Sequence, residues 1–320
     1  MVYSESKIIM KCSIIILNWN GAEMLRTYLP SVVNSVQHSA ISHQTEIVVA
    51  DNGSTDNSLE VLRNEFPTVR TIVLDKNYGF AEGYNRAIEE LCTIYRQQSV
   101  PEPAYTVLLN SDVETPEGWL RPLIEYMDAH PEVAAVQPKV RSWRNKAYFE
   151  HAGAAGGYVN ALGYPYCRGR VLWKVEQDHG QYDTVAEVDW TTGACMCVRT
   201  KVYKESGGLD AAFFAHMEEI DLCWRMRNKG WKLACVPSSV VYHLGGGSLS
   251  YDNPRKNYLN HRNNLLMIYK NKQHPYGVLF IRFFLDYAAA CFYLLQGRPK
   301  SCKAVFEARR DYRRMRTEYR

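Results

Sequence analysis

The chain has 320 residues, of which 46% are hydrophobic and 22% charged, so it can bury a large core, and wholesale disorder is excluded. Its net charge of +4 is unevenly placed: residues 298–320 hold nine Lys and Arg against three Asp and Glu, a net charge of +6, which leaves about −2 for the remainder. A basic tail on a near-neutral body predicts a surface interaction and argues against a nucleic-acid-binding protein.

Cysteine usage and the first residues indicate the compartment. The nine cysteines are an odd number without a CxxC pair, which argues against a zinc ribbon and a disulfide framework. Residues 1–10 hold no basic start followed by a long apolar run, so no secretory signal is predicted. We therefore expect a cytoplasmic protein.

The first half of the chain alternates short apolar runs with amphipathic stretches, the pattern of βαβ units around a mostly parallel sheet. Strands are predicted at residues 12–17, 46–50, 71–74, 106–109 and 133–137. Helices are predicted at residues 22–36, 56–65 and 81–95, and from 115–116 through about 129. The predicted fold class is therefore α/β.

The second half is less regular. Residues 142–183 show little periodicity, whereas strands are predicted at 187–198 and 232–242, with a helix at 219–229 between them. Residues 277–295 are strongly apolar but interrupted by Arg282 and Asp286. This run predicts a helix that packs on the domain or lies in a membrane interface, with the basic tail facing anionic lipid. An ordinary buried helix explains it equally well, and a spanning helix stays open because the two charges can neutralise each other.

Polar residues follow the predicted strands, where ligands bind in open α/β sheets. Asp51, Asn52 and Gly53 come after the second strand, where an acid can hold a nucleoside and glycine allows a tight turn. Asn110 and Asp112 come after the fourth strand and point the same way, so their oxygens suit Mn²⁺ or Mg²⁺ bound to a diphosphate. Ordinary turn chemistry also explains the first of these motifs.

Two further motifs lie in the second half. Glu218, Glu219 and Asp221 crowd three carboxylates into the start of a predicted helix, where a general base is one reading and a solvated helix start is the other. His243 ends a strand before three glycines, which suits a metal ligand near a diphosphate, although a histidine at the edge of the core fits as well.

The motifs described above and the sequence segments around them resemble, in their order along the chain, the family 2 inverting glycosyltransferases with the GT-A fold. The most similar branch is that of the rhamnosyltransferase-like and galactofuranosyltransferase-like enzymes. The resemblance covers roughly residues 12–248 and weakens through Arg262-Asn263. It rests on SIIILNWNG, IVVADNGSTDNS, NYGFAEGYNRAI, VLLNSDV, TTGACMCVRT, FFAHMEEIDLCWRMRNKGW and VYHLGGGS.

The resemblance implies a role for each matching residue. Asp51 would hold the nucleobase with the Asn18 loop beside it, and Asp112 would bind the metal together with His243. Asn110 stands where many relatives carry a further acid. The remaining residues would shape the donor pocket (Asn77, Gly79 and Asn85) and line the acceptor side (Trp190 and Gly193).

The catalytic base is expected in the acidic motif. The family pattern Glu-Asp-x-Asp reads Glu218-Glu219-Ile220-Asp221 here, so Glu219 is the predicted base, with Glu218 and Asp221 as the alternatives. The implied reaction is a single displacement that inverts the anomeric configuration. The donor is dTDP-rhamnose or a UDP-hexose, and the acceptor is a saccharide or a lipid-linked saccharide in cell-surface polysaccharide assembly.

The resemblance also implies a domain division. Residues 1–262 would form the GT-A domain, with a donor half at about 10–140 and an acceptor half at about 141–262. The apolar run and the basic tail predict that residues 263–320 form a helical, basic extension that can associate with the cytoplasmic face of the membrane. Two other functions stay open: a nucleotide-sugar-binding scaffold without catalysis, and a sugar nucleotidyltransferase. The second lacks a Gly-rich basic phosphate loop after the first strand, and the absence of GxGxxG there argues against a dehydrogenase.

Overall fold

The computed structural model describes residues 11–39, 41–151, 153–171, 174–245 and 253–319. Its main sheet contains β1 (Cys12–Asn18), β2 (Thr45–Asp51), β3 (Arg70–Val73), β4 (Tyr105–Asn110), β5 (Val113–Glu114), β6 (Val133–Ser142), β11 (Ala186–Glu187), β12 (Cys195–Arg199) and β13 (Lys232–His243). The strand order is β11-β13-β6-β12-β4-β1-β2-β3, with β5 paired to the end of β13.

The sheet is mixed but mostly parallel. β1 pairs in parallel with both β2 and β4, β2 pairs in parallel with β3, and β6 pairs in parallel with β13. β12 runs antiparallel to β4 and to β6 and so joins the two parallel parts. The predicted mostly parallel α/β sheet is confirmed.

Helices cover both faces of this sheet. They are α1 (Ala22–Gln37), α2 (Ser58–Glu65), α3 (Gly79–Gln97), α4 (Leu120–Ala129), α5 (Thr200–Glu205) and α6 (Glu218–Asn228). Ile14 and Ile16 of β1 share a core with residues of α1, α2 and α4, whereas Ile15 shares a core with residues of α3, α5 and α6. Successive side chains of a strand point to opposite faces, and both faces are covered here, which is why most of this strand is apolar.

Two predicted elements differ from the structure. The strand predicted at 187–198 is divided into β11 and β12, because the segment between them turns away and the Thr192 amide donates to Gln137 Oε1 at 2.9 Å. The helix predicted from 115–116 begins only at Leu120, after Gly118 with a φ of 78°. The irregular stretch 142–183 contains two small hairpins, formed by β7 (Gly157–Val159) with β8 (Pro165–Cys167) and by β9 (Arg170–Val171) with β10 (Lys174–Val175).

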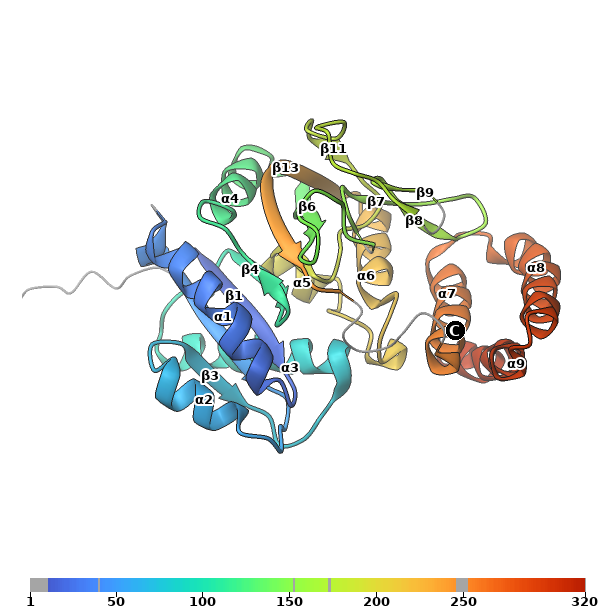
Figure 1. Cartoon of the computed structure of the whole chain (residues 1–320), viewed down its shortest axis with the longest axis horizontal. Coiled ribbons are helices and arrows are strands. Elements are labelled where there is room, and N and C mark those ends of the chain that lie inside the picture. Colours follow the sequence, from blue (N-terminus) through green and yellow to red (C-terminus); the bar gives the residue numbers. More distant parts are fainter. Residues whose placement is uncertain (1–10, 40, 152, 172–173, 246–252, 320) are drawn as a thin grey trace, which may run out of the picture.

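Three helices follow the sheet domain and gather at one end of the molecule: α7 (Pro254–Asn271), α8 (Pro275–Leu295) and α9 (Pro299–Met315) (Figure 1). The Asn253 side chain caps α7 by accepting from the Arg255 amide at 2.9 Å, and Pro254 occupies the first turn. The predicted boundary between residues 262 and 263 falls inside α7, which contacts α6 as well as α8 and α9.

Candidate active site

The ends of three parallel strands bring Asn18, Asp51 and Asn110 to one edge of the sheet. In the register of the strands, Asn18 stands opposite Asp51, and Leu17 stands opposite Asn110. Parallel strands necessarily share this carboxyl edge, so residues far apart in the sequence become neighbours here.

Asp51 is buried and belongs to a tight network of the two loops that follow β1 and β2. Its Oδ2 accepts from Asn18 Nδ2 at 3.1 Å, and its Oδ1 accepts from the Ser54 amide at 2.9 Å. The Asn18 Oδ1 atom is buried and has no partner among the described residues. The network fixes the Asp51 carboxylate beside a buried acceptor atom whose hydrogen-bonding capacity is unused among the described residues.

Asn52 organises the segment between β3 and α3. Its side-chain nitrogen donates to Asn77 Oδ1 at 3.1 Å and to the Gly79 carbonyl at 3.0 Å, and its oxygen accepts from the Tyr78 amide at 3.0 Å. Gly53 has a φ of 72°, and a Cβ atom there would lie 2.5 Å from the Lys76 backbone. Only glycine allows the two loops to approach this closely.

Two of the predicted residues lie in structural contacts instead. Asn85 joins α3 to the segment before α6, since its Nδ2 donates to the Leu209 carbonyl at 2.7 Å and its Oδ1 accepts from the Tyr203 hydroxyl at 2.6 Å. Trp190 is buried against Gly157, and its indole nitrogen donates to the Tyr158 carbonyl at 3.0 Å.

Asp112 and His243 meet at the same edge. β5 pairs with the end of β13, so that His243 stands opposite Val113, and Asp112 Oδ1 lies 3.1 Å from His243 Nε2. The Asn110 side-chain nitrogen lies 3.4 Å from the same imidazole nitrogen. Burial alone would lower the pKa of His243, but the Asp112 and Glu150 carboxylates raise it to about 10.

Glu150 is a site residue that sequence reasoning missed. Its Oε2 lies 3.7 Å from His243 Nδ1, so the imidazole is held between two carboxylates. A carboxylate on the second ring nitrogen is the usual partner of a histidine that binds metal. Glu150 lies in the irregular stretch 142–183, where no periodicity marks it.

The Asp112–His243 pair fits a divalent cation whose other positions are filled by diphosphate and water. The Asp112 carboxylate oxygen suits Mn²⁺ or Mg²⁺, and His243 can join it as a ligand once its proton is released, because a metal binds only the neutral imidazole. Within the described ranges, no three His, Cys, Asp or Glu side chains are arranged to hold an ion by themselves. The residues present therefore fit a metal that is shared with a ligand.

Glu218 and Glu219 open α6 and lie close to the other side of this edge. A Cβ atom on Gly193 would lie 3.5 Å from the Phe80 ring and 3.7 Å from the Glu219 side chain. The next residue, Ala194, accepts from the Asn110 amide at 3.0 Å. A short turn thus joins the acidic motif to the Asn110–Asp112 segment.

Both glutamates are unusual carboxyl groups. Burial raises the pKa of Glu219 to about 7, and burial together with the charge of Glu219 raises the pKa of Glu218 well above its ordinary value. The Oε2 atom of each has no hydrogen-bond partner in the part of the chain that the structure describes. Buried carboxyls with an unpaired oxygen are typical of general acids and bases.

Asp221 is not brought to this edge. Two residues further along a helix place it about 200° round the axis from Glu219. There its carboxylate pairs with Arg225 at 2.8 Å and Lys270 at 3.0 Å and accepts from Asn271 at 2.8 Å. It holds α6 to α7.

The segment before α6 is strained and is held by α7. Phe214, His216 and Met217 have φ values of 64°, 69° and 72°, a region that residues with a Cβ rarely adopt. The Asn263 side-chain nitrogen lies within donating distance of three carbonyls of this segment, and Arg262 Nη2 donates to Phe213 at 2.9 Å. The family resemblance extends, though weakly, to Arg262 and Asn263. This similarity was the feature of the sequence that could have indicated their contact with the segment before α6.

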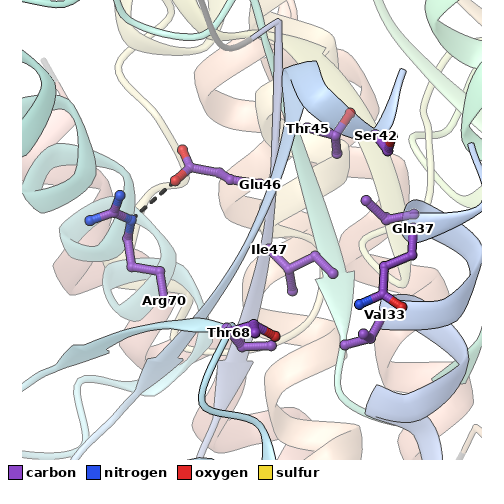
Figure 2. A pocket seen from close by; sticks show the side chains of 10 residues that line it. Val33, Gln37, Ser42, Thr45, Glu46, Ile47, Thr68 and Arg70 are labelled. Carbon is purple, nitrogen blue, oxygen red and sulfur yellow. Dashed lines mark hydrogen bonds and ion pairs between the residues drawn. The ribbon is translucent and has the colours of Figure 1, made fainter. Parts of the chain in front are cut away.

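A surface hollow lies at the opposite edge of the sheet. Figure 2 shows its lining, which includes Thr45, Ile47 and Thr68, and the ion pair of 3.1 Å between Glu46 and Arg70. Thr45 and Arg70 are the first residues of β2 and β3, whereas Asp51 ends β2. The hollow is therefore separate from the candidate site.

Comparison with known proteins decides the family. The model of glycosyl transferase family 2 matches residues 13–204, more than half of the chain. The chain belongs to glycosyl transferase family 2. It is accordingly a glycosyltransferase, and the family predicted from the motifs is confirmed.

This glycosyltransferase is similar to two curated rhamnosyltransferases. It is 25% identical to the N-acetylglucosaminyl-diphospho-decaprenol L-rhamnosyltransferase of Mycobacterium tuberculosis, over 67% of this chain and 71% of the relative. It is also 25% identical to rhamnosyltransferase WbbL of Escherichia coli, over 52% of this chain and 61% of the relative.

Among solved structures, the glycosyltransferase is similar to mannosyltransferase PcManGT from Pyrobaculum calidifontis in complex with GDP-Man and Mn²⁺. The TM-score is 0.56 at 14% identity, over 93% of this chain and 74% of that one. The predicted GT-A fold is confirmed.

Proposed function

We propose that this glycosyltransferase transfers a hexosyl group, with inversion, from a nucleotide-sugar to an acceptor hydroxyl at the edge that carries Asp112, His243 and Glu219. The observation that carries the proposal is their arrangement. A carboxylate–imidazole pair that can hold a cation is joined by the Gly193 turn to the Glu219 carboxyl, whose Oε2 atom is buried without a hydrogen-bond partner among the described residues.

The donor side is the Asn18–Asp51 network. Asp51 and the unpaired Asn18 Oδ1 offer acceptors to a nucleobase, and the loops that Asn52, Gly53, Asn77 and Gly79 hold together form the wall beside it. We expect dTDP-rhamnose first, because both relatives described above are rhamnosyltransferases, and a UDP-hexose second.

Asp112 and His243 would hold Mn²⁺ or Mg²⁺, with Asn110 beside them and Glu150 orienting the imidazole. The bound cation would supply positive charge to the departing diphosphate. Deprotonation of the acceptor hydroxyl would be the task of the acidic motif at the start of α6.

Glu219 would act as the general base. Its ionised Oε2 would take the proton of the acceptor hydroxyl while the acceptor oxygen forms a bond to the anomeric carbon and the bond to the diphosphate oxygen breaks. The electron pair of that bond leaves with the diphosphate, so one displacement inverts the configuration. Glu218, more deeply buried, would keep its proton and limit the negative charge beside the base.

For the acceptor we propose a lipid-linked saccharide at the cytoplasmic face of a membrane. The name of the mycobacterial relative specifies a diphospho-decaprenol acceptor, and the C-terminal helices of this chain carry an apolar and basic surface. We propose that the extension comprises α7–α9 as a unit, because α7 packs on both α8 and α9.

The test is a binding and hydrolysis screen of UDP-, GDP- and dTDP-sugars with Mn²⁺ or Mg²⁺, comparing the wild type with Asp112→Ala. Metal-dependent binding of one donor that is lost in Asp112→Ala supports the site and identifies the nucleotide. Binding that is indifferent to metal and to Asp112 would refute the metal assignment. Donor binding without turnover would favour the scaffold, and pyrophosphate from a sugar phosphate and a nucleoside triphosphate would favour a nucleotidyltransferase. NMR of the product must show an inverted anomeric configuration.

A further inference from the structure

The helix α8 is amphipathic in the reverse of the usual sense. Its charged residues face inward, with Arg282 only 1% and Asp286 0% exposed. Its large apolar side chains face outward, and Phe280, Phe284 and Phe292 are 67%, 57% and 59% exposed. Tyr276, Ile281, Leu285, Leu294 and Leu295 extend this surface. Soluble proteins rarely leave so large a contiguous apolar patch uncovered.

The inward charges make several contacts with neighbouring elements, although the Nε atoms of Arg282 and Arg309 have no hydrogen-bond partner among the described residues. The Arg282 guanidinium pairs with Asp286 at 3.3 Å, hydrogen-bonds the Asn264 side chain and stacks over the Tyr164 ring at 3.7 Å. Asp286 also pairs with Arg309 of α9 and lies 3.5 Å from His261 of α7.

This network determines how α8 can meet a membrane. By length and composition it is the one helix among the described residues that could cross a bilayer. Spanning would keep the Arg282–Asp286 pair, but it would separate Asp286 from Arg309 and His261 and Arg282 from Asn264, and it would leave the buried Arg309 without its carboxylate, which is unfavourable. The helix therefore stays on α7 and α9 and presents only its outer face.

The neighbouring surface of α9 indicates what covers this face. Phe306 is exposed and packs against Tyr287 of α8 with ring centroids 5.2 Å apart. Three exposed cations lie on the same side of α9 as Phe306, because they are three residues before it and four and seven residues after it: Lys303, Arg310 and Arg313. Lys300 is exposed at the start of the helix. An apolar stripe beside a basic one is complementary to the acyl chains and head groups of an anionic leaflet.

A second copy of the chain is a poorer occupant. A two-fold dimer through this face would juxtapose identical surfaces and bring the basic stripes of the two α9 helices near each other. Like charges across an interface oppose association.

We propose that α8 lies flat in one leaflet of an anionic membrane, with Phe280, Phe284 and Phe292 among the acyl chains and the α9 cations on the head groups. This inference rests on the proposed function, because a membrane-bound enzyme can reach a lipid-linked acceptor. Lipid binding can nevertheless be measured without any sugar transfer. His261 contacts α8 while the next two residues hold the strained segment of the active site, so the membrane surface and the catalytic edge share α7.

The experiment is co-sedimentation of the full chain with vesicles of phosphatidylcholine alone and of phosphatidylcholine mixed with phosphatidylglycerol. We expect binding to the anionic vesicles, weakened about tenfold or more in Phe280→Ser/Phe284→Ser/Phe292→Ser. Lys300→Glu/Lys303→Glu should weaken binding to the anionic vesicles. The matched control is Val73→Ser, which removes an exposed apolar side chain on the distant edge strand β3 and should leave binding unchanged.

Several outcomes would overturn this placement. They are absence of vesicle binding in the wild type, equal binding by the triple phenylalanine variant, and protein that resists extraction by alkaline carbonate, as a spanning helix does. A dimer that the triple variant converts to a monomer without loss of vesicle binding would assign the face to a second copy. Unchanged melting temperatures establish that the variants are folded. Vesicle binding retained in Glu219→Gln would separate this surface from the proposed catalytic role.

Discussion

The side-chain nitrogen of Asn263, on α7, donates at 2.8 Å to the carbonyl of His216, which belongs to the strained segment before α6. The same nitrogen lies 3.0 Å from the Phe213 carbonyl and 2.9 Å from that of Ala215. A residue of the C-terminal helices therefore holds the backbone from which Glu218 and Glu219 project.

Replacing Asn263 by Ala should lower turnover about 100-fold. The strained segment before α6 would relax and move the Glu219 carboxyl away from the acceptor hydroxyl. The donor KM should change little, since the Asn18–Asp51 network is untouched. The matched control is Asn264→Ala, because the neighbouring asparagine is also buried but bonds Arg282 and Gly163. Steady-state kinetics of the two variants at equal folded fraction make the comparison. Equal losses of turnover in both would refute a specific role of Asn263.

Glu219→Gln should reduce kcat by about 100- to 10,000-fold, the usual contribution of a general base, while donor affinity is preserved. Asp221→Asn should instead lower the melting temperature, because it breaks the ion pairs to Arg225 and Lys270, and keep much of its activity per folded molecule. Titration calorimetry with the donor and thermal unfolding separate the two effects. Full activity in Glu219→Gln would transfer the role to Glu218.

The pH dependence should report the same carboxyl. Since burial raises the pKa of Glu219 from 4.5 to about 7, the base is ionised only above that range, and kcat/KM should rise with pH through about 7. This ascending limb should be absent from the residual activity of Glu219→Gln. A wild-type profile that is flat between pH 5 and pH 8 would contradict the assignment.

The free energy of unfolding should change with pH in the direction opposite to kcat/KM. A carboxyl whose pKa is raised on folding stabilises the protein while it is protonated, and this contribution is lost as the pH rises through the folded-state pKa. The free energy of unfolding of Glu219→Gln minus that of the wild type should therefore be larger above pH 7 than near pH 4.5. Urea unfolding of both proteins across this range measures the change. A stability difference independent of pH would mean that the pKa of Glu219 is not raised on folding.

Glu150→Gln should weaken Mn²⁺ binding about 10- to 100-fold, because the amide orients the His243 imidazole less well than the carboxylate does. Calorimetric titration of Mn²⁺ in the presence of nucleoside diphosphate provides the readout without turnover. Glu114→Gln, at a more exposed carboxylate paired with Lys146, is the control and should bind Mn²⁺ normally. Identical affinities in the two variants would exclude an orienting role for Glu150.

The amino-acid sequence by itself determined the sheet and the location of its functional edge. Uninterrupted β-branched runs such as the one at residues 12–17 specify strands buried on both faces, and polar residues that follow such strands must gather where parallel strands end. That is why Asn18, Asp51 and Asn110 could be placed at one edge from the sequence alone, whereas the pairing of Asp112 with His243 at a metal came from the family resemblance.

Only the tertiary structure decided which acid of the motif faces the edge. The motif does not reveal which side of α6 is covered, and it was the packing of α7 that buried Asp221 in ion pairs. Glu150 escaped prediction because irregular backbone carries no periodicity from which a side-chain direction can be inferred. The orientation of α8 was undetermined for a related reason. A helix that is apolar on most sides can bury any of them, and here Asn264, His261 and Arg309 stabilise the burial of its charges and leave the phenylalanines outside.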